Sequence, residues 1–307
     1  MLNVLGKSAT TEANLAIDFR DLAFLLPDKE ETTYMAGNEK EDFVISIEGI
    51  GNAGKTTQIR LLTESLWNDY NIAAHKIINR KLLEDALKPL SNGPKEKFWV
   101  AYFPQVEIGV DLLAHTALYG QRFVEIRREL PPIPYIIVVE RYLYSGLMHA
   151  ATRAVLKEMA KFFKSGSFAP EFLAELVRKE AIEKKIEFID LVEQYANIAG
   201  KNAAPEVNRL YEVFLDMEKI MKWPDLVFVM DLPVRQVRFR ELKRENRAYT
   251  DGDVIYWTIA TRMYRLAAER EPDRVHLIDG SREPEDIRKE IAKIVKKKCK
   301  LRNFRKR

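Results

Sequence analysis

Five short runs of mostly apolar residues recur along the chain, at residues 43–48, 72–78, 135–140, 226–231 and 274–279. Such runs, without polar alternation, are typical of strands that are buried on both faces of a sheet. Apolar residues follow helical spacing in the stretches that separate or follow them, at residues 55–70, 110–130, 234–245, 253–269 and 283–298. This alternation predicts an α/β fold in which helices cover both faces of a five-stranded parallel sheet.

The stretch from about residue 152 to residue 221 does not follow this alternation. Its apolar spacing is helical throughout, and glycines and prolines predict breaks near residues 166–170 and 200–205. We therefore predict one α/β domain at residues 41–298 that contains a helical insertion at about 152–221. Residues 1–40 are expected to form an N-terminal extension, in which we recognise no functional motif, and residues 299–307 a basic tail.

The composition is that of a folded protein. Hydrophobic residues make up 47% and charged residues 31%, which excludes disordered, collagen-like and coiled-coil classes. The single cysteine, Cys299, can form neither an internal disulfide nor a thiolate metal cluster. No stretch approaches about eighteen uncharged apolar residues, and the N-terminal residues lack the apolar centre of a signal peptide. We therefore expect a cytoplasmic protein without a membrane anchor.

The net charge of +4 is unevenly distributed, because residues 291–307 carry nine cations and no acid. The remaining residues carry a net charge of −5, so the basic character belongs to the C-terminal segment. We interpret that segment as solvated lysines and arginines after a final helix, and we do not expect nucleic acid as a partner. A nucleic-acid-binding arm is the alternative.

A glycine-rich sequence, GIGNAGKT at residues 49–56, directly follows the first predicted strand and precedes a predicted helix. It matches the pattern G-x-x-x-x-G-K-[ST], whose glycines let backbone amides approach a phosphate at the partially positive start of a helix. Lys55 would contact the β- and γ-phosphates, and Thr56 would bind Mg²⁺. The candidate nucleotide-binding residues are Gly49, Ile50, Gly51, Asn52, Ala53, Gly54, Lys55, Thr56 and Thr57.

Glu48, Glu140 and Asp231 each end a predicted strand. Ligands of open parallel sheets bind at the carboxyl ends of the strands, so we expect the functional site at this edge. A structural turn is the alternative interpretation of the glycine-rich sequence. No N-K-x-D sequence follows a later predicted strand, which argues against a GTPase.

The segments FVISIEGIGNAGKTTQ at residues 43–58 and VVERYLYS at 138–145 together resemble thymidylate kinases, which are nucleoside monophosphate kinases. The resemblance extends to PDLVFVMDLP at 224–233, WTIATRMYRLAAE at 257–269 and VHLIDGSREPEDI at 275–287. It implies a P-loop kinase-type three-layer fold with a lid. It also implies ATP-dependent transfer of a γ-phosphoryl group to a deoxynucleoside monophosphate, expected to be dTMP, with Mg²⁺ as metal and a homodimer as assembly.

The resemblance also assigns roles around the phosphate. Lys55 and Thr56 match the phosphate and metal ligands. Glu140 takes the acidic place of the family's Asp-Arg-Tyr sequence, and Arg141 takes the place of the arginine that binds the acceptor phosphate. Glu140 would hold a water on Mg²⁺, as part of the metal site, or polarise the acceptor. A structural ion pair between Glu140 and Arg141 is the alternative reading of these two residues.

Three arginines, Arg240, Arg244 and Arg247, match positions of the lid. Arginine suits a lid, because its permanent charge and bidentate geometry neutralise a transferring phosphoryl group. Asn52 stands where some family members have a phosphate-loop arginine, so we expect the lid to supply the catalytic arginine, with Arg244 as the strongest candidate. The alternative is an exposed helix face whose arginines pair with interleaved glutamates.

Candidate residues for the acceptor come from the segment after the second strand and from the long helix that follows. The resemblance places Arg80 near the acceptor phosphate, and it places Arg122 near the base, with Tyr119 or Gln121 as alternatives. Phe103 and Phe123 would either stack on a base or belong to the core. The four histidines show no metal-ligand spacing.

Two departures from the family pattern leave the acceptor open. Gly51 stands where the family has an acid that meets the sugar 3′-hydroxyl, and the helical insertion is about twice the family's length. One alternative is a deoxynucleoside kinase, which needs a carboxylate base near the second strand end, where Glu84 and Asp85 come late. The other is a nucleotide-binding protein without catalytic activity.

Overall fold

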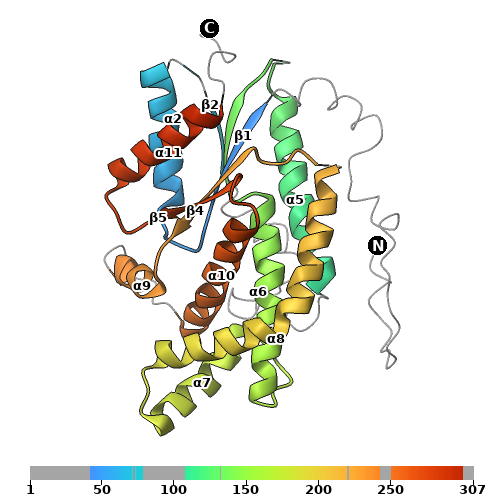
Figure 1. Ribbon diagram of the computed structural model, residues 1–307, viewed down its shortest axis with the longest axis vertical. Helices are drawn as coiled ribbons and strands as arrows, with labels where there is room; N and C mark the ends of the chain where they lie inside the picture. The colour runs from blue at the N-terminus through green and yellow to red at the C-terminus, as the bar shows by residue number, and fades with distance from the viewer. Residues whose placement is uncertain are drawn as a thin grey trace.

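The structure is a computed structural model that describes residues 42–70, 72, 74–78, 108–131, 133–219, 221–242 and 250–299. Within these residues, a central sheet lies between two layers of helices (Figure 1). The predicted N-terminal extension and all of the basic tail after Cys299 lie outside the described residues.

The sheet is parallel throughout and has the strand order β2-β3-β1-β4-β5. This confirms the predicted five-stranded parallel α/β fold. The strands are β1 (Phe43–Glu48), β2 (Ala74–Ile78), β3 (Ile136–Glu140), β4 (Leu226–Asp231) and β5 (Val275–Asp279). The described part of β2 is shorter than predicted, because it begins two residues later. In the register, Ile47 pairs with Glu140 and Glu48 with Val229, so β1 ends between β3 and β4 at one edge.

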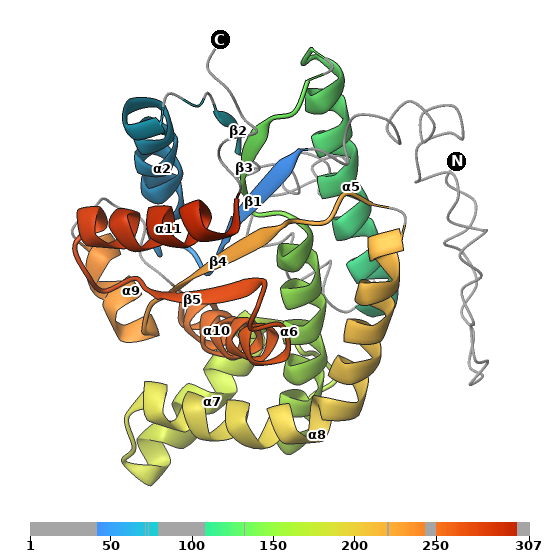
Figure 2. The same cartoon turned by 45° about the horizontal axis from the view of Figure 1, so that its top comes forward.

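Successive residues of the buried strands pack into two different cores. Val44 belongs to the core beneath α5 (Ile108–Arg128), α6 (Leu143–Phe162) and α10 (Asp251–Arg270). Ile45 and Ile47 belong to the core beneath α2 (Lys55–Tyr70) and α11 (Pro284–Lys298). Figure 2 shows these layers on opposite faces of the sheet. Strands without polar alternation are therefore required, because each face is covered by helices.

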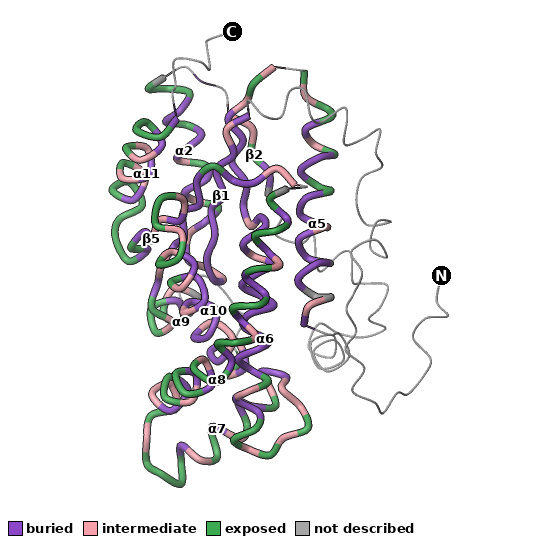
Figure 3. The backbone as a smooth tube through the Cα atoms, turned by 45° about the vertical axis from the view of Figure 1, so that its right-hand side comes forward, coloured by how far each residue is buried: buried purple, intermediate pink, exposed green. Residues whose placement is uncertain are grey.

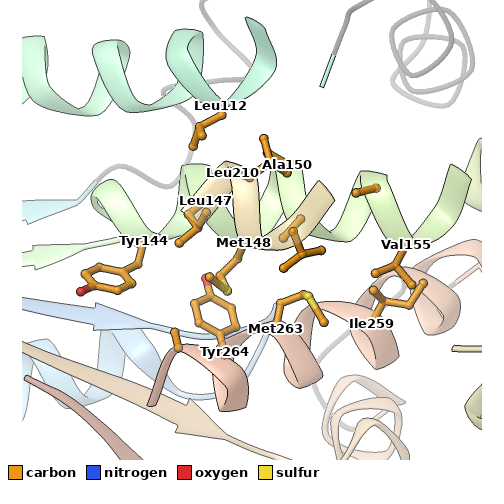
Figure 4. Packing of buried hydrophobic residues seen from close by; sticks show 14 of the residues in the cluster. Leu112, Tyr144, Leu147, Met148, Ala150, Val155, Leu210, Ile259, Met263 and Tyr264 are labelled. Carbon is orange, nitrogen blue, oxygen red and sulfur yellow. The ribbon is translucent and has the colours of Figure 1, made fainter. Parts of the chain in front are cut away.

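The helical insertion extends the first of these layers. It contains α7 (Pro170–Lys184), α8 (Phe188–Asp216) and the 3-10 turn η4 (Met217–Lys219), and α8 packs along α6. Figure 4 shows the shared core, which contains Leu210 of α8 together with Leu147 and Met148 of α6, Leu112 of α5 and Met263 of α10. The insertion therefore continues the main core.

The predicted break near 166–170 is confirmed, whereas the break predicted near 200–205 is wrong. Helix α8 runs without interruption through Gly200 and Pro205. Pro205 and Lys201 are both exposed, so the Lys201 carbonyl that loses its helical donor lies on the solvent side. The actual break is at Lys185, which ends α7 with a left-handed backbone at φ 54°.

The C-terminal part of the domain contains α9 (Val234–Leu242), α10, β5 and α11. Helix α10 begins two residues earlier than predicted, because Thr250 and Asp253 form a reciprocal capping box at its start. Figure 3 shows that the central strand β1 is mostly buried, whereas the edge strand β5 is partly exposed and α11 presents an exposed outer face. None of the helices in the described ranges is both long enough and apolar enough to cross a membrane.

Candidate functional site

The loop at residues 49–54 connects the central strand β1 to α2 through unusual backbone conformations. Gly49, Asn52 and Gly54 have φ values of 128°, 51° and 97°. A side chain at Gly49 would also lie 2.9 Å from the carbonyl oxygen of Met230, so only glycine fits there. Backbones of this kind turn amide groups into an anion-binding concavity, and the start of α2 adds partial positive charge. The loop thus has the geometry of a phosphate cradle.

Lys55 and Thr56 are the first two residues of α2. Lys55 is only 5% exposed, and its Nζ donates a 2.6 Å hydrogen bond to the Ile50 carbonyl, so the ammonium group lies within the loop. The exposed Thr56 donates from Oγ1 to Glu140 Oε2 at 2.8 Å. This bond joins the loop after β1 to the end of β3.

Glu140 is the last residue of β3, and Arg141 begins the turn that follows. Glu140 is buried, and Arg141 adopts a left-handed backbone with φ 58°. The amide of Arg141 donates to the Ile47 carbonyl of β1 at 3.2 Å, so the turn is hydrogen-bonded to the strand that leads into the loop. The Glu140 carboxylate therefore contacts the phosphate cradle, and the backbone of Arg141 lies beside the strand that leads into the cradle.

Tyrosines from two helices surround the guanidinium group of Arg141. Burial opposes its charge, but interactions with Tyr119, Tyr264, Tyr256 and Glu140 outweigh this effect and raise its pKa above the ordinary value. Burial raises the pKa of Tyr119 to about 12, although the charge of Arg141 partly offsets this. Arg141 is consequently a permanent cation, and the hydroxyl of Tyr119 is neutral at physiological pH.

The loop residue Gly51 lies against α10. A Cβ atom at this position would be 3.2 Å from Cζ2 of Trp257, whose side chain is half-buried. The indole therefore takes up the space that a side chain at position 51 would need. Trp257 begins the segment at residues 257–269 that belongs to the resemblance, but the sequence assigned this side chain no role of its own.

The lid candidate Arg240 contacts Gly280, which lies near Ala53 of the loop. It donates from Nη2 to the Gly280 carbonyl at 2.7 Å, and a Cβ at Gly280 would lie 3.5 Å from the Ala53 carbonyl. The third strand-end acid, Asp231, pairs with Arg265 at 3.0 Å. Arg240 is thus close to the phosphate cradle, whereas Asp231 is engaged in an ion pair with α10.

The other predicted residues have different positions. Arg122 is on the solvent side of α5, where it pairs with Glu125 at 3.1 Å, and Gln121 donates to the same glutamate at 3.3 Å. Phe123 is 1% exposed and packs on Tyr142 with ring centroids 5.4 Å apart, so it belongs to the core. The remaining candidates, Arg80, Phe103, Arg244 and Arg247, lie outside the described residues.

The described residues contain no group of three or more His, Cys, Asp or Glu side chains that could hold a metal ion. The Thr56 hydroxyl and the Glu140 carboxylate nevertheless offer two oxygen atoms in direct contact. Mg²⁺ prefers oxygen ligands and commonly takes one or two from protein and the rest from water and substrate phosphates. The pair therefore fits a magnesium ion that binds together with a nucleotide.

Comparison with solved structures finds a crystal structure of thymidylate kinase from Ehrlichia chaffeensis among those that match. The two chains share 16% sequence identity, the match covers 83% of this chain and 98% of that chain, and the TM-score is 0.43. No protein-family model matches the sequence, and no similar sequence is found among curated proteins. Similarity at this level does not carry an activity from one protein to another.

Proposed function

We propose that the protein is a nucleoside monophosphate kinase that transfers the γ-phosphoryl group of ATP to dTMP, with dTDP and ADP as products. The observation that carries the proposal is the 2.8 Å hydrogen bond from Thr56 to Glu140. It joins the phosphate cradle to the turn that bears Arg141, so the two parts needed for a donor and an acceptor phosphate adjoin each other.

The cradle would hold the polyphosphate of ATP. Amides of residues 49–54 and the N-terminus of α2 would bind phosphate oxygens, and Lys55 would move from the Ile50 carbonyl to the β- and γ-phosphates. Thr56 and Glu140 would hold Mg²⁺, which supplies further neutralisation of phosphate charge when bound. The protein thereby stabilises charge without forming a covalent intermediate.

Arg141 would bind the acceptor phosphate and hold one of its oxygens in line with the γ-phosphorus. That oxygen forms the new P–O bond as the bond to the β-phosphate oxygen breaks and ADP leaves. A phosphate oxygen is already ionised at neutral pH, so this reaction needs no general base. A nucleoside kinase would need a carboxylate to deprotonate a hydroxyl.

The lid would complete the site. Arg240, Arg244 and Arg247 would close over the transferring group and stabilise charge on its equatorial oxygens. The contact of Arg240 with Gly280, next to Ala53 of the cradle, supports this for the first of the three. For the acceptor we propose contacts from Arg80 and Tyr119. The proximity of Tyr119 to Arg141 supports the second of these contacts.

The test is a coupled ADP-release assay with ATP and Mg²⁺ across all nucleoside monophosphates and nucleosides. We expect the fastest release with dTMP, and we expect Lys55→Met to lower it by about 100-fold or more, because that variant keeps bulk and loses charge. Lys293→Met is the matched control, since Lys293 is an exposed lysine on α11 and its variant should keep wild-type activity.

Other outcomes would replace the proposal. Turnover with thymidine and none with dTMP would assign a deoxynucleoside kinase. ATP binding without ADP release for any acceptor would assign a nucleotide-binding protein that does not catalyse transfer. Unchanged kcat in a folded Lys55→Met variant would reject the role of the loop. The expected homodimer is checked separately by light scattering.

A further inference from the structure

The carboxylate of Glu48 lies beneath the site, at the last residue of β1. The residue is 0% exposed and directly precedes the phosphate cradle. Both of its carboxylate oxygens accept hydrogen bonds. Oε1 accepts from Ser46 Oγ at 2.6 Å and from the Tyr142 amide at 2.7 Å. Oε2 accepts from Ser145 Oγ at 2.5 Å and from Tyr264 OH at 3.3 Å.

The donors come from three separate parts of the fold. Ser46 belongs to β1 itself, Tyr142 and Ser145 belong to the turn and first residues after β3, and Tyr264 belongs to α10. Burial and the charge of Glu48 raise the pKa of Tyr264 well above its ordinary value, so its hydroxyl stays protonated and donates. A buried carboxylate that accepts four hydrogen bonds restrains the positions of the elements that supply the donors.

The turn that Glu48 restrains through these hydrogen bonds includes Arg141, whose backbone is left-handed. Residues other than glycine rarely adopt this conformation unless their surroundings impose it. Two contacts with β1 flank the position: the Arg141 amide donates to the Ile47 carbonyl, and the next amide, that of Tyr142, donates to Glu48. Ser145 adds a third contact one helical turn further on.

We propose that Glu48 is a positioning residue that fixes the turn at residues 141–145, so that the Arg141 side chain is held ready for the acceptor phosphate. This inference rests on the proposed function for the role of Arg141. Glu48 touches neither nucleotide nor metal in this scheme, because its two oxygens are occupied by protein donors and the residue has no solvent access. It acts through Arg141.

The experiment compares two serine variants that each remove one hydrogen bond to the same carboxylate. Ser145→Ala removes a bond to the turn, whereas Ser46→Ala removes a bond within β1 and is the control. Glu48→Gln is the third variant and removes the charge. Two readouts are taken for each protein: hydrogen exchange of the peptide that covers residues 141–146, and the KM and kcat for dTMP.

We expect hydrogen exchange in this peptide to become at least about tenfold faster in Ser145→Ala and Glu48→Gln, because a hydrogen bond to a charged group is lost. We expect the KM for dTMP to rise by about tenfold in the same two variants, with kcat within about twofold for Ser145→Ala. Ser46→Ala should change neither readout by more than about twofold.

The outcomes separate this inference from the proposed function. Faster exchange without a change in KM would show that Glu48 holds the turn but not the acceptor site, and would overturn the inference. Equal effects of Ser145→Ala and Ser46→Ala on both readouts would show that Glu48 only stabilises the fold, and would reject its role in positioning Arg141. If the wild-type protein turns over no acceptor, the proposed function fails. Unchanged hydrogen exchange in Ser145→Ala would show that Glu48 does not restrain the turn, whatever the activity of the protein.

Discussion

Gly51 lies where the phosphate cradle meets α10, and the indole of Trp257 fills the space beside it. The sequence identified Gly51 because the family pattern has an acid there. It did not identify Trp257, which is 206 positions further along the chain and carries no motif of its own. The same limit applies to the contacts of Glu48 with Ser145 and Tyr264, which join residues 97 and 216 positions apart. Such contacts depend on how the elements pack, which local patterns do not encode.

Introducing a side chain at Gly51 should therefore destabilise the protein. We expect Gly51→Asp to lower the free energy of unfolding by roughly 1–3 kcal/mol, because the indole must shift to admit the new atoms. In a Trp257→Leu background the same substitution should cost less than half as much, which a double-mutant cycle by urea denaturation would measure.

Gly200→Ala is the control for this cycle. A Cβ at Gly200 of α8 would meet no atom within 4 Å, so alanine should raise stability by roughly 0.5–1 kcal/mol. Equal penalties for Gly51→Asp in both backgrounds would show that Trp257 is not the obstacle.

Helix α8 shows how packing can override a local signal. Gly200 and Pro205 predicted a break, yet the helix is continuous because Ala203, Val207 and Leu210 bury one face against the core. The break near 166–170 was predicted, because glycine and serine occur in the segment between the end of α6 and the start of α7, and proline is the first residue of α7. The break between α7 and α8 at Lys185 has no comparable signal in the sequence, because lysine commonly occurs within helices.

Replacing Pro205 should stabilise α8. Proline in a helix interior costs up to about 3 kcal/mol relative to alanine, so we expect Pro205→Ala to raise the free energy of unfolding by roughly 1–3 kcal/mol. Thermal and urea unfolding measure the change. The neighbouring Ala204→Gly variant, also on the exposed side, should lower stability by roughly 0.5–1 kcal/mol. A fall in stability for Pro205→Ala would mean that the proline stabilises this helix.

At the scale of the whole molecule, strand order decides which side chains meet. Because β1 lies between β3 and β4, the residues that end these strands share one edge with the phosphate cradle. The alternation of strands and helices predicted this edge of the sheet. The glycine-rich sequence GIGNAGKT predicted the phosphate cradle. These patterns predicted neither the strand order nor the partners of the strand-end acids. Asp231 forms an ion pair with Arg265, whereas Glu140 accepts a hydrogen bond from Thr56. Those choices follow from the tertiary arrangement.

The most direct test of the central claim is to follow phosphoryl transfer by phosphorus NMR in a mixture of the protein, ATP, Mg²⁺ and dTMP. We predict that dTDP and ADP appear in equal amounts, while inorganic phosphate does not accumulate. Release of inorganic phosphate with dTMP unchanged would contradict the claim, because the cradle would then serve hydrolysis rather than transfer to an acceptor held by Arg141.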